Sequence, residues 1–248
     1  MFNLFKPQNQ NLMRLTTKRR LDQVLLKAGI EDPASVTELA IHGVMERIDF
    51  RFIRKKMSKT LQVLDITNAT IDEGKLNRGA LARCIALTSI AIPHWVIEIG
   101  EGAFSNCINL KSFTIPKSVI KIGELAFWGC SSLTEISIPD SVVELGFRAF
   151  NNCTGLTSVV LPNSLVKIGG SAFGKCSGLT SIIIPNSVTE IGNGVFSHCT
   201  NLTTVNIPES VINIGEYAFM NCNAYITVDP KNPVYAGEEG KLVLKKRW

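Results

Sequence analysis

The chain has 248 residues, of which 45% are hydrophobic and 19% are charged, and its formal net charge is +5. This apolar content is enough for a continuous core, and no apolar run reaches the roughly 18 residues that predict a membrane-spanning helix. The basic N-terminal stretch lacks an apolar segment followed by a small-residue cleavage site, so we expect neither a membrane span nor a signal peptide in this chain.

The positive charge lies at the two ends of the chain. Residues 1–60 carry 12 Lys and Arg against 6 Asp and Glu, and residues 231–248 carry 5 against 2. Between them, residues 61–230 carry 9 basic against 13 acidic side chains. Basic ends can contact nucleic acid or a membrane surface, but more often they are solvated caps. We therefore expect no nucleic-acid partner.

The N-terminal region predicts short, irregular elements. Residues 1–14 are polar and predict a loose arm, and residues 17–29 predict an amphipathic helix. Residues 37–41 and 61–66 predict strands, and residues 49–57 between them predict a short helix. The two strands resemble each other, so we interpret this region as two irregular units that lead into a repeat, because terminal repeats lack one neighbour.

A pattern with a period of 23 residues follows, from Cys84 to Cys222. Four residue types keep the same phase in six successive units. They are Pro93, Pro116, Pro139, Pro162, Pro185 and Pro208; Gly100, Gly123, Gly146, Gly169, Gly192 and Gly215; Phe104, Phe127, Phe150, Phe173, Phe196 and Phe219; and Cys107, Cys130, Cys153, Cys176, Cys199 and Cys222. A fixed period of this length predicts a solenoid, because one unit cannot bury its apolar face alone.

Residues 107–129 illustrate the unit. Phe113 and Ile115 alternate with polar residues, which predicts a short strand, and Pro116 ends it because proline cannot donate to the ladder. A second extended pair of apolar residues comes before Gly123. We expect this glycine to turn the chain into one or two helical turns, with the following alanine and phenylalanine pointing inward.

The seven cysteines occupy one position in their units and predict a column of small, buried side chains. Side chains at equivalent positions of stacked coils run parallel, which does not suit a disulfide. The chain has no Cys-x-x-Cys motif, so we expect no zinc site. Burial among apolar groups also raises a thiol's pKa and argues against a nucleophile. The pattern offers these cysteines no obvious hydrogen-bond partner.

No catalytic arrangement is evident in the sequence. The three histidines, His42, His94 and His198, lie in different parts of the chain, and no Ser/His/Asp or Cys/His set can be assembled from them. The Gly-x-Gly pairs lack the third glycine of a dinucleotide loop. We expect no enzyme activity, no catalytic residue, no cofactor and no metal.

The repeated pattern L-x-x-I-x-I-P-x-S-V-x-x-I-G-x-x-A-F-x-x-C resembles the BspA-like class of leucine-rich repeats. Six units match it almost position by position, and the resemblance covers roughly residues 35–245. It implies an α/β repeat fold, a right-handed leucine-rich-repeat solenoid with strands on one face and short helices opposite. It also implies a cell-surface or secreted protein that binds other proteins.

The repeat divides the chain into four parts. Residues 1–36 form an N-terminal arm and capping helix, and residues 37–83 form irregular lead-in repeats. Residues 84–222 contain six regular leucine-rich repeats of 23 residues, and residues 223–248 form an atypical C-terminal repeat with a hairpin cap.

Because core positions must repeat, we expect function in exposed positions that differ between units. Leu125, Trp128 and Phe147 fall at outward positions of neighbouring units, and large aromatic residues are enriched in interface cores. Val160 and Ile183 occupy an exposed strand position where other units carry polar residues. The alternatives are local packing for the first set and ordinary scatter of exposed apolar residues for the second.

One column of charged residues precedes the glycines by two positions. Its members are Glu98, Lys121, Glu144, Lys167, Glu190 and Asn213, so the sign alternates through five units. In stacked extended segments these side chains point outward, and neighbours of opposite sign stabilise the pairing. The column predicts a charge ladder along the solenoid.

Together these features predict a non-enzymatic protein-binding module, namely a cell-surface adhesin or host-interaction protein that is a monomer. The alternative is an intracellular scaffold or assembly protein. Residues Leu125, Trp128, Phe147, Val160 and Ile183 are the expected contacts with a protein partner, whose identity the sequence does not give.

Overall fold

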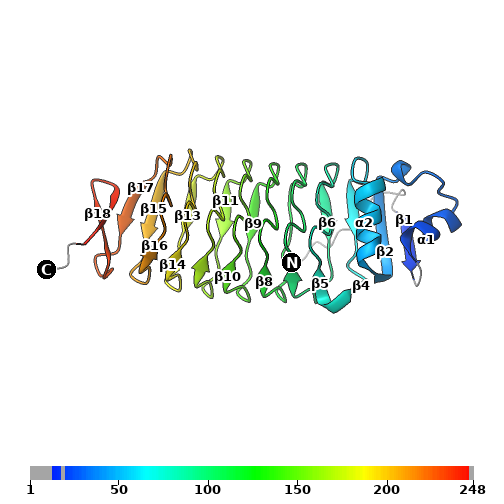
Figure 1. Cartoon of the computed structure of the whole chain (residues 1–248), viewed down its shortest axis with the longest axis horizontal. Coiled ribbons are helices and arrows are strands. Elements are labelled where there is room, and N and C mark those ends of the chain that lie inside the picture. Colours follow the sequence, from blue (N-terminus) through cyan, green and yellow to red (C-terminus); the bar gives the residue numbers. More distant parts are fainter. Residues whose placement is uncertain (1–12, 18–19, 246–248) are drawn as a thin grey trace, which may run out of the picture.

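The computed structural model describes residues 13–17 and 20–245, and they form an elongated stack of coils (Figure 1). The predicted arm over residues 1–14 lies almost entirely outside the described residues. The two α-helices lie at one end of the stack, and a β-hairpin lies at the other. The core runs through the middle of the stack, as expected for a solenoid. The right-handed sense of the coil stays a prediction.

Parallel strands form two rows along the stack. The first row contains β2 (Glu38–Met45), β3 (Val63–Asp65), β6 (Ser89–Ala91), β9 (Glu135–Ser137), β11 (Ser158–Val160), β13 (Ser181–Ile183), β15 (Thr204–Ile207) and β17 (Tyr225–Val228). The second row contains β5 (Lys75–Leu76), β7 (Glu98–Ile99), β8 (Lys121–Ile122), β10 (Glu144–Leu145), β12 (Lys167–Ile168), β14 (Glu190–Ile191) and β16 (Asn213–Ile214), which form one seven-stranded sheet. Two further strands, β1 (Met13–Thr17) and β4 (Ala69–Ile71), pair with β2.

The third side of each regular coil is formed by turns, so the short helices predicted after each glycine are wrong. No helical residue occurs from residue 75 to residue 245. Instead, backbone N–H groups on this side donate to carbonyl oxygens of the next coil, as from Gly102 to Glu124 at 2.8 Å and from Phe104 to Ala126 at 2.8 Å. The peptide groups that a helix would pair internally are therefore paired between coils.

Helices occur only in the N-terminal region of the described chain. They are α1 (Leu21–Lys27) and α2 (Arg47–Lys56), with 3-10 turns η1 (Pro33–Ser35) and η2 (Asp72–Gly74). The predicted helix over residues 17–29 is thus shorter than expected, and α2 begins at Arg47, two residues before the predicted start at residue 49. Asp49 lies in the first turn of α2 and forms a capping box with Glu46.

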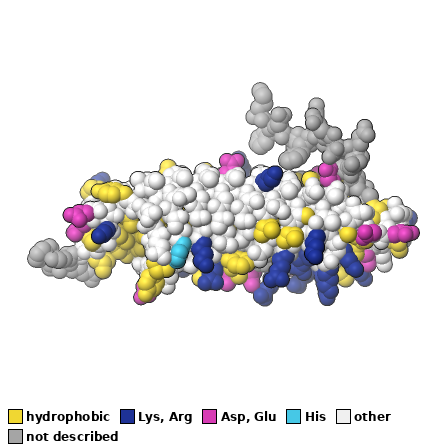
Figure 2. Space-filling view, turned by 90° about the horizontal axis from the view of Figure 1, so that it is seen from above, with side chains coloured by type: hydrophobic (Ala, Val, Ile, Leu, Met, Phe, Trp, Pro, Cys, Tyr) yellow, Lys and Arg dark blue, Asp and Glu magenta, His cyan; other side chains and the backbone are white. Residues whose placement is uncertain are grey.

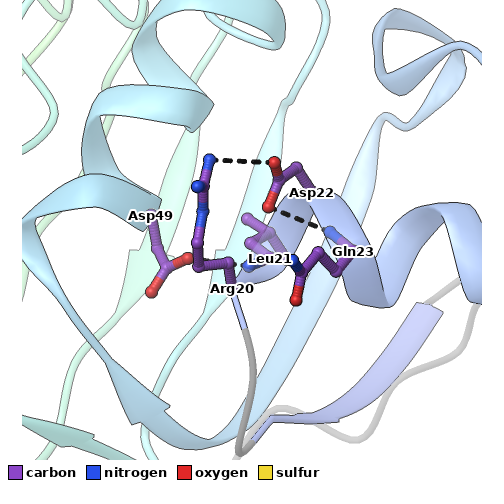
Figure 3. A network of polar contacts seen from close by, with 5 residues as sticks. All are labelled: Arg20, Leu21, Asp22, Gln23 and Asp49. Atoms are coloured by element: carbon purple, nitrogen blue, oxygen red, sulfur yellow. Dashed lines mark hydrogen bonds and ion pairs between the residues drawn. The ribbon is translucent and has the colours of Figure 1, made fainter.

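Asp49 also ties the two helices together. Its side chain is 4% exposed. One carboxylate oxygen accepts a hydrogen bond from the backbone N–H of Leu21 at 2.7 Å, and the other accepts from the backbone N–H of Glu46 at 2.9 Å. Figure 3 shows Asp49 beside Leu21 at the start of α1. The lead-in coils therefore depend on a buried carboxylate that accepts hydrogen bonds from backbone N–H groups at the starts of both helices.

The core of the regular coils is a column of stacked phenylalanine rings. From Phe104 to Phe219, the centroids of neighbouring rings lie 5.1 to 5.9 Å apart, and their planes are nearly parallel. The glycine column permits this close stacking. A Cβ added at Gly146 would lie 2.6 Å from the carbonyl carbon of Gly123, so any side chain there would push the coils apart.

The last regular coil is closed by a buried asparagine and a hairpin. Asn232 is fully buried, and its amide donates to the carbonyl oxygens of Pro208 and Val211 at 2.8 Å each. The hairpin then follows as β18 (Tyr235–Glu238) and β19 (Lys241–Leu244), which pair antiparallel. Asn232 therefore satisfies carbonyl groups that would otherwise face an absent next coil.

Candidate functional site

The five residues expected to contact a partner lie on two different sides of the stack. Leu125, Trp128 and Phe147 lie on the turns and are called here the turn-face patch. Val160 and Ile183 lie on the first row of strands and are called the strand-face pair. The five residues therefore form two candidate surfaces, which we describe separately.

Within the turn-face patch, Leu125 and Phe147 lie on adjacent coils. The backbone N–H of Leu125 donates to the carbonyl oxygen of Phe147 at 2.9 Å. Phe147 is 43% exposed, its ring lies beside Gly170 of the next coil, and the Arg148 guanidinium stands 4.8 Å from the ring centroid. Phe147 is therefore available to a partner on one side and packed on the other.

Trp128 has a clear packing role in the same patch. It is half-buried, and its indole N–H donates to Oδ1 of Asn151 in the next coil at 3.2 Å. The amide of Asn151 continues the chain of contacts by donating to the Ser171 carbonyl oxygen at 3.2 Å. These bonds link three successive coils, so Trp128 covers the junction between coils in addition to any contact it makes with a partner.

Leu125 holds an unfavourable backbone conformation. Its φ is +56°, in the left-handed region, where glycine stands at the equivalent positions 102 and 194. A non-glycine residue there costs about 1–2 kcal/mol. The turn conformation was not expected from the sequence, although the two glycines in this column were a signal of it. Arg148, Ser171 and Tyr217 hold the same conformation in other coils, so this strain belongs to the repeat and does not single out Leu125 as a contact residue.

The strand-face pair is far more accessible. Val160 is 58% exposed on β11, and Ile183 is 83% exposed on β13. The equivalent residues of three other coils are Thr114, Ser137 and Asn206, which are polar and exposed, and the coil that contains β6 has the small, half-buried Ala91. Neither apolar side chain has a part in the core, because the residues on each side of it along the strand point inward.

A third exposed apolar feature was missed by sequence reasoning. Next to the second row of strands, five aliphatic side chains in one column are between 39% and 59% exposed, and they are called here the aliphatic stripe. Its members are Ile97, Ile120, Val143, Val166 and Ile212. The signal was present, since the core positions on each side of this column were already assigned and the stripe repeats with the same period.

The charged column lies beside the aliphatic stripe in the predicted register. Strand pairing places Glu98 beside Lys121, Glu144 beside Lys167, and Lys167 beside Glu190. Two of these neighbours form ion pairs, Lys121 with Glu98 at 2.9 Å and Lys167 with Glu190 at 3.2 Å. Pairing of β5 with β7 adds Lys75 at the start, which sequence reasoning did not include. The structure therefore shows the predicted register of the charged column and two of its ion pairs.

The cysteines form the expected inward column, but the expectation that they lack a partner is wrong. The Cys153 thiol donates to the carbonyl oxygen of Phe127 at 3.1 Å, and four other cysteines make the equivalent bond. All seven are free thiols. Burial raises the pKa of the Cys84 and Cys199 thiols to about 12, and it raises the pKa of Cys153 well above its ordinary value. Such thiols are poor nucleophiles at neutral pH.

The remaining polar groups form no reactive cluster in the ranges that the structure describes. No group of three or more His, Cys, Asp or Glu side chains there is placed to hold a metal ion. His198 contacts the Asn221 amide at 3.0 Å, on the turn side. No helix within residues 13–17 and 20–245 has the length and apolar character that a membrane crossing requires.

The repeats, the stacked coils and the matched positions identify the class of protein. Residues 74–177 and 126–236 match the BspA type leucine rich repeat region, with six copies, so the chain belongs to the BspA-type leucine-rich-repeat family. Repeat proteins of this kind are generally protein-interaction modules. No curated protein matches the chain.

Solved structures of bacterial leucine-rich-repeat proteins resemble this fold. A leucine-rich-repeat protein of T. pallidum shares 27% identity and a TM-score of 0.62, over 73% of this chain and 82% of that chain. A leucine-rich cell surface protein of Faecalibacterium prausnitzii shares 24% identity and a TM-score of 0.49, over 79% of this chain and 65% of that chain. A protein of Eubacterium ventriosum shares 25% identity and a TM-score of 0.49, over 55% and 37%.

Proposed function

We propose that this chain is a non-enzymatic protein-binding module and that the strand-face pair is the centre of its contact surface. The proposal is supported by membership in a family of interaction modules and by one observation above all. Ile183 is 83% exposed, and its neighbour in the adjacent coil, Val160, is 58% exposed, at a position that is polar in three other coils and alanine in a fourth. Exposed apolar side chains without a packing role favour an interface.

The surroundings of the pair suit a broad, flat contact. The other outward side chains of the first strand row are mostly small and polar, such as Thr157, Ser158, Thr180 and Ser181. Small side chains allow a partner's backbone or aromatic groups to approach closely, while the two aliphatic side chains supply the desolvated centre. The turn-face patch is the alternative surface, with Phe147 as its most accessible member.

The finer form of the proposal is a cell-surface adhesin or host-interaction protein that is a monomer and binds no nucleic acid. The alternative is an intracellular scaffold or assembly protein. Locating the full-length protein by epitope labelling of intact and permeabilised cells separates the two. Labelling without permeabilisation supports the surface role, and labelling only after permeabilisation supports the scaffold.

The experiment that tests the binding surface is a pull-down from surface-protein extracts and from cytosol with four forms of the chain. These are the native chain, Val160→Thr with Ile183→Thr, Trp128→Ala with Phe147→Ala, and Ile120→Thr with Val143→Thr. Threonine occurs naturally at the equivalent strand position 114 and in the stripe column at 189, so these replacements suit the fold.

We expect one partner to be retained by the native chain and by the turn-face and stripe variants, and to be lost by the strand-face variant. A partner retained by the strand-face variant and lost by the turn-face variant would move the contact to the turns. A partner bound equally by all four forms would contradict both surfaces.

A further inference from the structure

A basic pocket lies between α2 and the turn over residues 77–80 of the following coil, away from the strand-face pair. Its volume is about 350 Å³. Arg47, Arg51 and Arg54 line it from α2, and Arg78 lines it from the neighbouring coil. We call this feature the arginine pocket. Figure 2 shows Lys and Arg side chains gathered along one long edge of the stack, toward the end that holds the helices.

Two of the four guanidinium groups are held by the protein. Nη1 of Arg54 donates to the carbonyl oxygen of Gly79, which fixes the floor of the pocket against the turn. Nη2 of Arg78 lies 3.0 Å from Oε1 of Glu101, in a pair whose side chains are 76% and 41% exposed. Such an exposed pair is weak, so Arg78 is free to turn toward a bound anion.

The other two guanidinium groups have no partner among the residues that the structure describes. Arg47 and Arg51 are exposed, and neither makes an ion pair or a side-chain hydrogen bond within residues 13–17 and 20–245. They are one helical turn apart, where like charges repel each other. Arg47 is also the first residue of α2, where the helix dipole favours negative charge. This repulsion is weak because both side chains are exposed, and an anion between them would turn it into attraction.

The acidic residues near the start of α2 do not neutralise the pocket. Both carboxylate oxygens of Asp49 accept backbone N–H groups, and Asp49 is buried. The Glu46 side chain accepts the backbone N–H of the third helical residue in the capping box. The remaining charges of α2 are basic, including Lys55 and Lys56 in its last turn. Even with these two carboxylates counted, residues 46–56 carry five basic against two acidic side chains, so the helix keeps a net positive charge.

We propose that the arginine pocket binds a phosphate dianion, either free or as a monoester. A guanidinium fork binds an oxyanion through two parallel hydrogen bonds. A carboxylate has two oxygens and one charge, and it engages one guanidinium group in this way. A phosphate group has three terminal oxygens and two charges, so it can engage the guanidinium groups of both Arg47 and Arg51. Ile48 lines the same pocket and is 39% exposed, so an organic group on a monoester has an apolar wall to contact.

The test is calorimetric titration of the full chain at low ionic strength, where screening is least. The ligands are inorganic phosphate and phenyl phosphate, with phenyl sulfate and benzoate as comparators. We expect saturable binding of phosphate that is at least tenfold tighter than binding of phenyl sulfate or benzoate. Tighter binding of phenyl phosphate than of inorganic phosphate identifies a monoester as the natural ligand, and equal binding identifies free phosphate.

Two variants with the same loss of charge separate the pocket from the general field of the helix. Arg47→Gln with Arg51→Gln should weaken phosphate binding at least tenfold, whereas Lys55→Gln with Lys56→Gln should change it less than about twofold, because those lysines lie outside the pocket. Arg51→Lys keeps the charge and removes the fork, and it should weaken binding severalfold. Unfolding midpoints verify that each variant is folded.

Three results would overturn the proposal. They are the absence of saturable phosphate binding, an equal loss in the lysine and arginine variants, and binding of phenyl sulfate or benzoate as tight as that of phenyl phosphate. The proposal does not rest on the strand-face surface. Its test is therefore independent of the test of the protein-binding function.

Discussion

The lead-in coils and the regular coils complete the third side of the solenoid in two different ways. In the lead-in region, the ten-residue helix α2 fills that side, and Leu39 pairs with Leu64 at a spacing of 25 residues. In the regular coils, turns fill it, and Lys167 pairs with Glu190 at a spacing of 23. A helix pairs its own peptide groups and leaves its N-terminus to be capped, whereas the turns pair with neighbouring coils.

This difference decides which residues each region requires. The regular coils need glycine where backbones approach, and they need core residues of similar size so that every coil fits the next. The lead-in coil needs a buried carboxylate, Asp49, to satisfy helix N–H groups. The regular coils are therefore nearly interchangeable, whereas the lead-in coil carries features of its own, including the arginine pocket.

The largest expected effect is on thiol reactivity. Burial raises the pKa of Cys84 and Cys199 to about 12, so at pH 8 their thiolate populations are about a thousandfold lower than for an exposed thiol. Cys222, at the end of the regular array, is only half-buried. We expect a thiol reagent to modify Cys222 first in native protein and the other six only after denaturant is added. Mass spectrometry of timed samples measures this, and rapid modification of four or more sites would contradict the buried column.

The next effect concerns the phenylalanine column. Phe150 stacks on rings in both neighbouring coils, at 5.1 and 5.6 Å, so Phe150→Ala should lower the free energy of unfolding by about 3–5 kcal/mol. Phe219 is half-buried and stacks on one ring only. Its replacement by alanine is the matched control and should cost clearly less. Urea denaturation measures both, and equal losses would show that the regular coils do not share a continuous core.

Much of the regular array could be predicted because its core residues are the ones that repeat. The phase of proline, glycine, phenylalanine and cysteine located the strands and the buried columns. The turns could not be told from helical turns, since an inward Ala-Phe pair suits both. What distinguishes them is the left-handed conformation at residues such as Leu125 and Tyr217, which are not glycine and give no local signal.

The candidate sites were harder to predict than the fold. The exposure of Val160 and Ile183 could be predicted from the alternation of side chains along a strand. The hydrogen bond between Trp128 and Asn151 could not, because it depends on how one coil packs on the next. The arginine pocket joins residues of α2 to Arg78 of the following coil, so its shape exists only after packing. The hydrogen bonds of five buried thiols were missed for the same reason.

The lead-in region gives a third prediction. Asp49→Asn replaces one acceptor oxygen by an amide that faces a backbone N–H, so we expect a loss of about 1–3 kcal/mol in the free energy of unfolding. Asp22→Asn, in a partly exposed pair with Arg20, is the control and should be nearly neutral. Thermal unfolding followed by circular dichroism measures the difference. If the two variants behave alike, the capping carboxylate is not what holds the lead-in helices.

The smallest effect is expected in the charge ladder. Lys121→Glu breaks the ion pair with Glu98 and places three glutamates in successive strands, β7, β8 and β10. We expect a loss of about 0.5 kcal/mol that is greater at low salt, because Lys121 is exposed and Glu98 is only partly buried. Lys111→Glu is the control, since Lys111 makes no ion pair within the described part of the chain. If Lys121→Glu leaves the free energy of unfolding unchanged at low ionic strength, the ladder has no structural role.

The central claim is that repeated positions hold the stack and that the chain-specific apolar pair Val160 and Ile183 binds the partner. The most direct test is the dissociation constant of the captured partner for the variant with Val160→Thr and Ile183→Thr. We predict at least a tenfold weaker complex, because central interface residues carry most of the binding energy, with the unfolding midpoint of the variant unchanged. An unchanged dissociation constant together with a lowered midpoint would contradict the claim.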